Sequence, residues 1–193
     1  MSFEDKIPLF PLSSHVLPEG KLPLRIFEPR YLRMVKESFA NASPIGMCML
    51  NKKPGMAPTE NVYPIGTAAY IVDFEALSGG LLGITVQGEQ CFEITNIQQE
   101  EDGLRIGEVN YLPIWDPVPV DYSSQSLADR LANLLTEHSE HGNLYLTPRL
   151  DDLTWICQRW LEILPLKPED KQRMMRSSSV TDAYRFLSQY LTR

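Results

Sequence analysis

LPLRIFEPRYLRMV, residues Leu22 to Val35, places the pattern of a strand directly before the pattern of a helix. Aliphatic residues alternate with other residues from Leu22 to Ile26, which is typical of a strand with one apolar face. Pro29 suits the first position of a helix, where its missing N–H leaves no hydrogen bond unmade. Apolar residues then recur at helical spacing. The stretch therefore predicts a strand that leads straight into a helix opened by Pro29.

Further strands are expected on both sides of this stretch. Pro8 and Pro11 would confine the first of them to a sheet edge, because proline cannot donate to the ladder. The apolar face switches near Gly107, which predicts a bulge there. Many short, bent strands favour a sheet curled into a barrel. The candidate strands are Ile7–Leu12, Pro44–Leu50, Ile65–Phe74, Leu81–Val86, Cys91–Ile97 and Leu104–Leu112.

The pattern of the sequence changes after Leu112, from strand-like to proline-rich and then helical. LPIWDPVPVDYSS holds three prolines and is typical of a connector. Helical spacing of apolar residues then continues to the C-terminus, with one helix capped by Asp151 or Asp152. We therefore expect an α+β fold, with a β barrel and one inserted helix in residues 1–115 and an α-helical bundle in residues 116–193. The helices are expected from Leu127 to a stop at Gly142, at Leu153–Leu164, from Pro168 onward and from a capping box at residues 179–182 onward.

Charge and composition narrow the possible partners. The 193 residues carry 25 acidic and 18 basic side chains, a formal net charge of −7, and neither half is basic. This balance counts against nucleic acid or an anionic membrane as the main partner. The sequence shows neither a signal-peptide pattern nor an apolar run long enough to span a membrane. Three widely separated cysteines are typical of buried thiols in a cytosolic protein, so we expect a cytoplasmic location.

The usual catalytic signatures are missing from the sequence. It has no Gly-x-Ser-x-Gly, Cys-x-x-Cys or His-Glu-x-x-His motif. His138 and His141 could share one helix face, but histidine is favoured at a helix C-terminus and no third metal ligand is evident. A Cys–His nucleophile pair stays open, because such residues meet in space rather than along the chain. We expect no catalytic residue, no bound metal and no cofactor.

Glu28 and Arg30 stand at the strand-to-helix corner. A carboxylate near a helix N-terminus is stabilised by about 0.3–1 kcal/mol, and Arg30 could be its ion partner. The alternative is that the corner presents both side chains to a ligand. The structural interpretation is the simpler one, and the binding interpretation stays open.

Several segments, in this order, resemble the N-terminal domain of ATP-dependent Lon proteases: IPLFPLSSHVLPEGKLPLRIFEPRYLRMV, YPIGTAAYIVDF, GLLGITVQGEQCFEI and EVNYLPIWD. LDDLTWICQRWLEILPLKPEDKQRMMRSSSVTDAYRFLSQYL is similar to the helical part of that domain, so the resemblance covers essentially the whole chain. The same domain also occurs in cereblon and in small stand-alone bacterial proteins, and we expect the stand-alone bacterial form here. Cys91 stands where relatives commonly carry arginine, and VLPEG replaces the commoner aromatic-Pro-Gly.

The resemblance implies a PUA-like β pseudo-barrel followed by a helical bundle, and a substrate-recruiting role without ATPase or peptidase chemistry. We expect a non-enzymatic module that binds unfolded or client polypeptides and could serve a separate ATP-dependent protease. An exposed sheet edge, or an apolar groove between barrel and bundle, would hold the polypeptide. RNA binding is the alternative, because PUA-like barrels also serve that purpose, and a hydrolase is a third possibility that no motif supports. The candidate contact residues are Glu28, Arg30, Tyr31, Trp115 and Tyr122.

Overall fold

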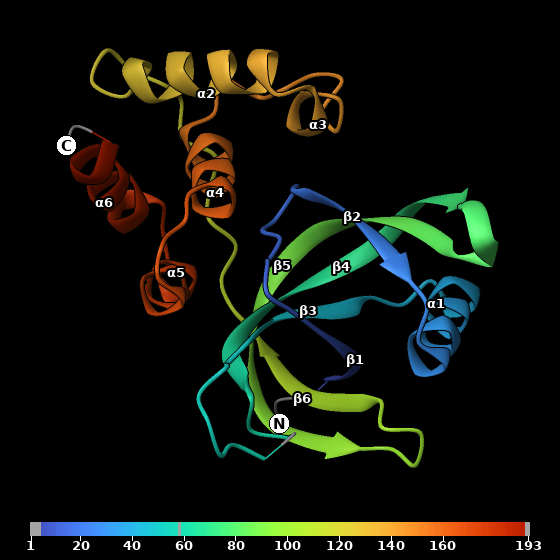
Figure 1. The fold of residues 1–193 in the computed structure, drawn as a ribbon. Helices are drawn as coiled ribbons and strands as arrows, with labels where there is room; N and C mark the ends of the chain where they lie inside the picture. The colour runs from blue at the N-terminus through green and yellow to red at the C-terminus, as the bar shows by residue number, and fades with distance from the viewer. Residues whose placement is uncertain (1–4, 58, 192–193) are drawn as a thin grey trace. The chain divides into compact units, whose positions relative to one another are not determined.

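The chain divides into two compact units, Met1–Pro113 and Ile114–Arg193. Figure 1 presents the fold as a computed structural model, which describes residues 5–57 and 59–191. Within these residues, all strands and helix α1 (Pro29–Asn41) belong to the first unit, and the other five α-helices belong to the second. The predicted α+β order, with strands first and helices afterwards, is confirmed.

Six strands form one mixed sheet in the first unit, in the order β2-β5-β4-β3-β1-β6. β6 also pairs with β5, so that β5, β4, β3, β1 and β6 close into a ring, which is the predicted barrel. One edge of β5 serves both neighbours, because β2 pairs with residues 82–87 and β6 with residues 92–99. The strands are β1 Asp5–Leu12, β2 Lys21–Ile26, β3 Ile45–Leu50, β4 Val62–Ala76, β5 Leu82–Gln99 and β6 Arg105–Tyr111.

β1 lies within this ring, so the prediction that Pro8 and Pro11 mark an edge strand was wrong. β1 pairs antiparallel with β6 over residues 5–9 and parallel with β3 over residues 9–12. Pro8 therefore lies in the part paired only with β6, and Pro11 in the part paired only with β3. Each proline can turn its ring nitrogen toward the side without a ladder, where the missing N–H costs nothing.

β5 joins two of the predicted strands into one. It runs through Gly88 with a bulge at Glu89. The bulge expected at Gly107 of β6 was also misplaced, since the register shift lies on the facing strand, where Thr95 of β5 is left unpaired. The apolar face switches around Gly107 because Leu104 and Val109 belong to two different hydrophobic clusters.

These two clusters lie on opposite faces of the sheet, because neighbouring residues of one strand alternate between them. Met47 belongs to the first and Cys48 to the second. Helix α1, Pro29–Asn41, covers the first cluster with Met34 and Val35. The second cluster is centred on Phe92, which is fully buried.

Close packing around Phe92 depends on glycine. A Cβ atom at Gly66 would lie 2.6 Å from the Phe92 ring and 2.7 Å from the carbonyl oxygen of Met47. A Cβ atom at Gly46 would lie 2.8 Å from a side-chain methyl group of Leu9. Both glycines therefore make room for large side chains inside the second cluster.

The second unit is built around helix α4, whose first nine residues are all buried. Asp152 caps it by accepting a hydrogen bond from the N–H of Thr154, as one of the two predicted caps. The predicted helix that reaches Gly142 is interrupted at His138, which ends α2. Among the helices that the structure describes, none has the length and apolarity needed to cross a membrane. The helices are α2 Gln125–Glu137, α3 Ser139–Gly142, α4 Leu153–Ile163, α5 Pro168–Arg176 and α6 Thr181–Leu191.

Candidate functional site

The predicted contact residues of the strand-to-helix corner meet around Arg30. Its guanidinium lies 2.7 Å from the carboxylate of Glu28 and donates a hydrogen bond of 3.1 Å to the carbonyl oxygen of Gly103. It also lies 4.8 Å from the centre of the Tyr31 ring, which packs edge-on against Phe10. Burial raises the pKa of the Tyr31 hydroxyl, and the charge of Arg30 opposes part of that rise.

A second arginine of α1 ties the helix to the same turn between β5 and β6. Nε of Arg33 donates to the carboxylate of Asp102 at 2.9 Å, and its guanidinium also bonds Glu100 and Glu37. The backbone N–H of Leu104 and the Arg33 charge hold the pKa of Asp102 below its ordinary value. The charged groups of this corner thus bind one another and fix α1 to the sheet. A role of Glu28, Arg30 and Tyr31 in polypeptide binding stays a prediction.

Trp115 and Tyr122 lie in the second unit. Trp115 is buried, and its indole N–H donates a 2.7 Å hydrogen bond to the carbonyl oxygen of Ser177 between α5 and α6. Tyr122 is 100% exposed. The structure thus gives Trp115 a packing contact, while the binding role predicted for both residues stays a prediction.

A groove of about 710 Å³ also lies in the second unit, between the connector and the start of α4. Its central acid, Asp152, already accepts hydrogen bonds from Val118 and Thr154 and pairs with Arg149 at 2.8 Å. These bonds hold the connector against α4, so the polar groups of this groove serve the fold.

The sheet of the first unit extends beyond β3 into a three-stranded ribbon (Figure 1). β3 pairs with β4 only over residues 62–69, whereas the pairing of β4 with β5 continues through residue 76. We call this part, which consists of β2 with residues 71–76 of β4 and 82–87 of β5, the ribbon end. It has two edges, β2 on one side and β4 on the other.

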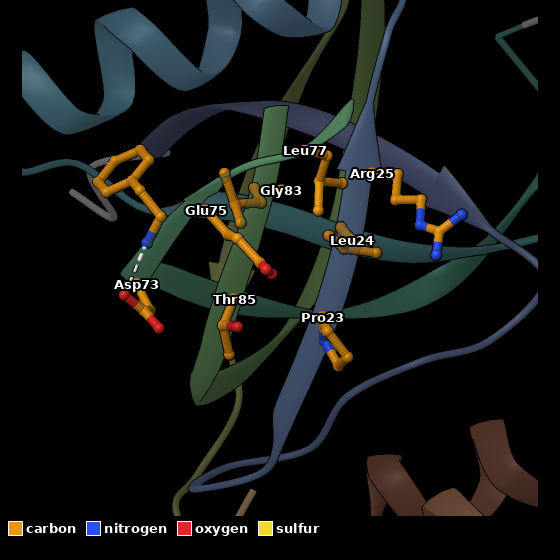
Figure 2. Close-up of a pocket in the computed structure, with 10 residues that line it drawn as sticks. Pro23, Leu24, Arg25, Asp73, Glu75, Leu77, Gly83 and Thr85 are labelled. Atoms are coloured by element: carbon orange, nitrogen blue, oxygen red, sulfur yellow. Dashed lines mark hydrogen bonds between the residues drawn. The ribbon is translucent and has the colours of Figure 1, made fainter. Parts of the chain in front are cut away.

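A pocket of about 300 Å³ opens on the ribbon end (Figure 2). Paired residues of the three strands form rows across it. Ile84, at the centre of the middle row, belongs to the cluster under α1, so the side chains of the two flanking rows point to the opposite face. The rows are Pro23–Thr85–Asp73, Leu24–Ile84–Phe74 and Arg25–Gly83–Glu75, and Leu77 completes the lining.

Gly83 lies at the centre of this face and lines the hollow. A Cβ atom there would lie 3.2 Å from the carbonyl oxygen of Glu75 and 3.3 Å from a methyl group of Leu77. Because glycine has no side chain, the Leu77 side chain can lie close to the strand there, between Gly83 and Arg25 (Figure 2). We call this hollow the Gly83 pocket.

Three exposed charged side chains surround the Gly83 pocket: Arg25 on β2, and Asp73 and Glu75 on β4. The guanidinium of Arg25 points away from Glu75 in Figure 2. Within the described ranges, neither of these two side chains forms an ion pair or hydrogen bond. The carboxylate of Asp73 accepts a 2.9 Å hydrogen bond from the backbone N–H of Phe74. The pocket therefore carries more negative than positive charge.

An exposed aromatic pair lies at the β4 edge of the ribbon end. The ring of Phe74 packs edge-on against Phe39 of α1, with 4.8 Å between ring centres. Phe74 is 40% and Phe39 is 63% exposed, and the neighbouring Val72 is exposed as well. Exposed apolar side chains that gather at one place mark interaction sites more often than isolated ones do.

The backbone of the β4 edge is also open. The carbonyl oxygen of Gly20, next to β2, accepts a hydrogen bond from the N–H of Gly88. The backbone N–H and C=O groups of the even-numbered residues of β5 therefore point toward β2. The backbone groups of the odd-numbered residues of β5 then point toward β4, where Thr85 pairs with Asp73. The backbone groups of Phe74 and Ala76 consequently point away from β5, toward the side where the structure describes no further strand.

The sequence alone did not reveal the ribbon end as a site. Its residues come from three separate segments, 23–25, 73–77 and 83–85, and only the register of the sheet brings them together. The one local signal was Gly83, because a glycine inside a strand often marks a place of close approach.

The comparisons with known proteins all lead to one protease family. The family model of the ATP-dependent protease La (LON) substrate-binding domain matches residues 6–193. A Lon protease from Parabacteroides distasonis is 29% identical over 132 residues, 67% of this chain and 16% of that protein. A Lon protease from Dictyoglomus thermophilum is 25% identical over 198 residues, 97% of this chain and 24% of that protein. The chain thus spans about a quarter or less of these relatives.

Two solved structures share the fold over nearly the whole chain. A Lon N-terminal domain protein from Xanthomonas campestris has a TM-score of 0.73 and 26% identity, covering 97% of this chain and 98% of that chain. The N-terminal domain of a Mycobacterium avium complex Lon protease has a TM-score of 0.61 and 15% identity, with the same coverage of both chains.

Proposed function

The chain belongs to the family of ATP-dependent protease La (LON) substrate-binding domains, and from this premise we propose that it binds unfolded segments of client polypeptides at the ribbon end. Its activity in this proposal is binding, without catalysis. The observation that carries the proposal is the exposed Phe39–Phe74 pair beside an open strand edge.

An unfolded segment differs from a folded surface in two ways that the ribbon end can recognise. It exposes apolar side chains, for which Phe39 and Phe74 offer aromatic area, and an aromatic contact contributes about 0.5–1.5 kcal/mol beyond the area that it buries. It also exposes unpaired backbone groups, which can pair with the free edge of a sheet. A folded protein offers both together only rarely.

The relatives named above suggest the partner of such a module. They are Lon proteases, and the chain matches about a quarter or less of their length. We therefore propose that polypeptides bound at the ribbon end are presented to an ATP-dependent protease of the cytoplasm. Degradation of an unfolded protein by a purified Lon protease, with and without the chain, tests this step: faster degradation supports presentation, and an unchanged or slower rate contradicts it.

Fluorescence anisotropy tests the binding itself. The probes are a labelled, reduced and alkylated protein that cannot refold, and a labelled RNA hairpin, each over a salt series. We expect saturable polypeptide binding that persists at high salt. We expect Phe39→Ala to weaken it about 5-fold or more, because truncating a contact residue at the centre of an interface costs over about 1 kcal/mol.

Leu146→Ala is the matched control, because Leu146 is also an exposed apolar residue, 95% accessible, but belongs to the second unit and not to the ribbon end. Equal loss of binding in both variants would contradict the proposed location. Binding of the RNA alone, with steep salt dependence, would favour the nucleic-acid alternative and refute the proposal.

A further inference from the structure

The two faces of the β4 edge differ in chemistry, and this difference defines a class of client segment. We infer that the edge takes an extended segment in which apolar and basic residues alternate. This inference rests on the proposed function and specifies the segments that the ribbon end prefers.

The alternation follows from the geometry of β4. Phe74 lies in the middle row, on the face covered by α1, and its ring meets Phe39 there. Asp73 and Glu75 flank it in sequence and point to the opposite face, around the Gly83 pocket (Figure 2). A strand added along this edge alternates its side chains in the same way. One set would meet the aromatic pair, and the other set would meet the two carboxylates.

Charge complementarity selects basic residues for the second set. Side chains directly opposite each other on neighbouring strands lie about 4.5–5.5 Å apart at Cβ, close enough for ion pairs. A lysine or arginine beside Glu75 would form an ion pair with this carboxylate, for which no described residue supplies a partner. An acidic residue there would face two carboxylates, since Arg25 lies on the far strand and points outward (Figure 2).

The Gly83 pocket gives the basic side chain a place to lie. A lysine or arginine carries an aliphatic stem, which packs on apolar surface while the charged end stays in water. Leu77 and Pro23 supply apolar walls of the hollow, whose volume is about 300 Å³. That volume is at the small end of the range for ligand sites and suits a single side chain.

The backbone of the β4 edge fits such a segment better than that of β2. By the same alternation, the free side of β2 presents Pro23, which has no N–H to donate. The β4 edge presents the carbonyl oxygen of Phe74 and both groups of Ala76. The N–H of Phe74 is held by the carboxylate of Asp73, and a lysine or arginine that draws this carboxylate away would release the N–H for pairing.

Labelled short peptides test the inference in anisotropy titrations with the full chain at low salt. One peptide alternates phenylalanine and lysine, a second has glutamate in place of lysine, and a third has the first peptide's composition with its phenylalanines and lysines in separate blocks. We expect the alternating Phe/Lys peptide to bind about 5-fold tighter than the Glu peptide, the upper end for an exposed ion pair. High salt should remove most of this difference. The blocked peptide should bind more weakly than the alternating one.

Protein variants locate the preference. Asp73→Asn combined with Glu75→Gln removes both charges while the asparagine can still accept from Phe74, and the preference for lysine should disappear. Glu101→Gln is the matched control, because it removes one exposed carboxylate outside the Gly83 pocket, and it should keep the preference. N-methylation of alternate residues of the Phe/Lys peptide removes donors from one of its edges and should weaken binding.

The outcomes separate this inference from the proposed function. If the Phe/Lys and Glu peptides bind equally, or if the double variant keeps the preference, the charge selection is refuted, although the function still stands. If neither of the two sets of alternate residues weakens binding when it is N-methylated, strand pairing is refuted. If neither the peptides nor the unfolded protein binds, the proposed function itself is refuted.

Discussion

Gly66→Ala gives the sharpest test of the packing around Phe92. The new methyl group would lie 2.6 Å from one ring atom of Phe92 and 2.7 Å from the carbonyl oxygen of Met47. Real carbon contacts are found at about 3.5–4.0 Å. Both the ring and the β3 backbone must therefore move away from residue 66, the ring by about 1 Å.

The contact with the backbone carbonyl oxygen of Met47 determines how much stability Gly66→Ala costs. Met47 is paired with Thr67 on β4 and lies in the middle of β3, so its carbonyl oxygen cannot shift without distorting the ladder. Overpacking a core costs typically about 1–3 kcal/mol, and we expect at least about 2 kcal/mol here. Gly46→Ala is the matched comparison, since its nearest contacts are all side-chain atoms that can rotate, and it should cost less.

Urea denaturation followed by circular dichroism, which includes the signal of the sheet, measures both costs. The midpoint should fall for both variants and fall further for Gly66→Ala, with an unchanged slope if only the folded state is affected. A loss below about 0.5 kcal/mol for Gly66→Ala, within the range of neutral surface substitutions, would refute this account of the second cluster. So would a larger loss for Gly46→Ala.

Three further predictions follow from other parts of the structure. Asp152→Ala removes the cap of α4 and should cost about 1–2 kcal/mol in urea denaturation, whereas Asp152→Asn should keep most of the stability; equal losses would contradict a capping role. The N–H of Leu104 lowers the pKa of Asp102 in the folded state from its ordinary value of 3.8, so the carboxylate stabilises the fold above that pH and stops doing so as the pH falls through the lowered value. Wild type should therefore exceed Asp102→Asn in stability at neutral pH and lose this advantage in acid, and a difference constant with pH would contradict it. Burial raises the pKa of Cys48 and of Cys157 to about 12, so iodoacetamide at pH 8 should label neither thiol of the folded chain and both in urea, as measured by mass spectrometry; rapid labelling of the folded chain would contradict their burial.

Local signals allowed much of the fold to be predicted. Pro29 opens α1 directly after β2, because the proline ring fits only the first turn of a helix. Asp152 caps α4 for an equally local reason, since its side chain reaches the N–H two residues ahead. The three cysteines are buried, as expected from their apolar surroundings.

Features that depend on pairing between distant segments could not be predicted. Pro8 reads as an edge residue in isolation, and only the staggered register of β1 between β6 and β3 explains how it fits inside the ring. Gly88 reads as a break between two strands, yet β5 continues through it, because a Cβ atom at that position would lie 2.2 Å from the carbonyl oxygen of Leu17 and glycine permits this close approach.

The residues of the candidate site fall into the same two groups, those predicted from local sequence and those that depend on pairing between distant segments. Glu28, Arg30 and Tyr31 were found because they are neighbours in sequence, and the structure brings them together without testing a binding role. Asp73 and Glu75 resemble ordinary exposed residues of a strand. They become candidate contact residues only because β3 does not pair with this part of β4, which leaves β4 at an edge of the sheet. Where a strand ends is decided by its pairing partners rather than by local sequence.

The closed ring has a consequence for synthesis on the ribosome. Asp5 of β1 pairs with Val109 of β6, so the first and last strands of the unit are direct neighbours. The N-terminal strand emerges first but lacks one of its two partners until about a hundred further residues have been made. Contacts this distant in sequence slow folding, and an unpaired strand edge is prone to association with other chains. The nascent barrel must therefore stay incomplete, with exposed edges of its own, until nearly the whole first unit has left the exit tunnel.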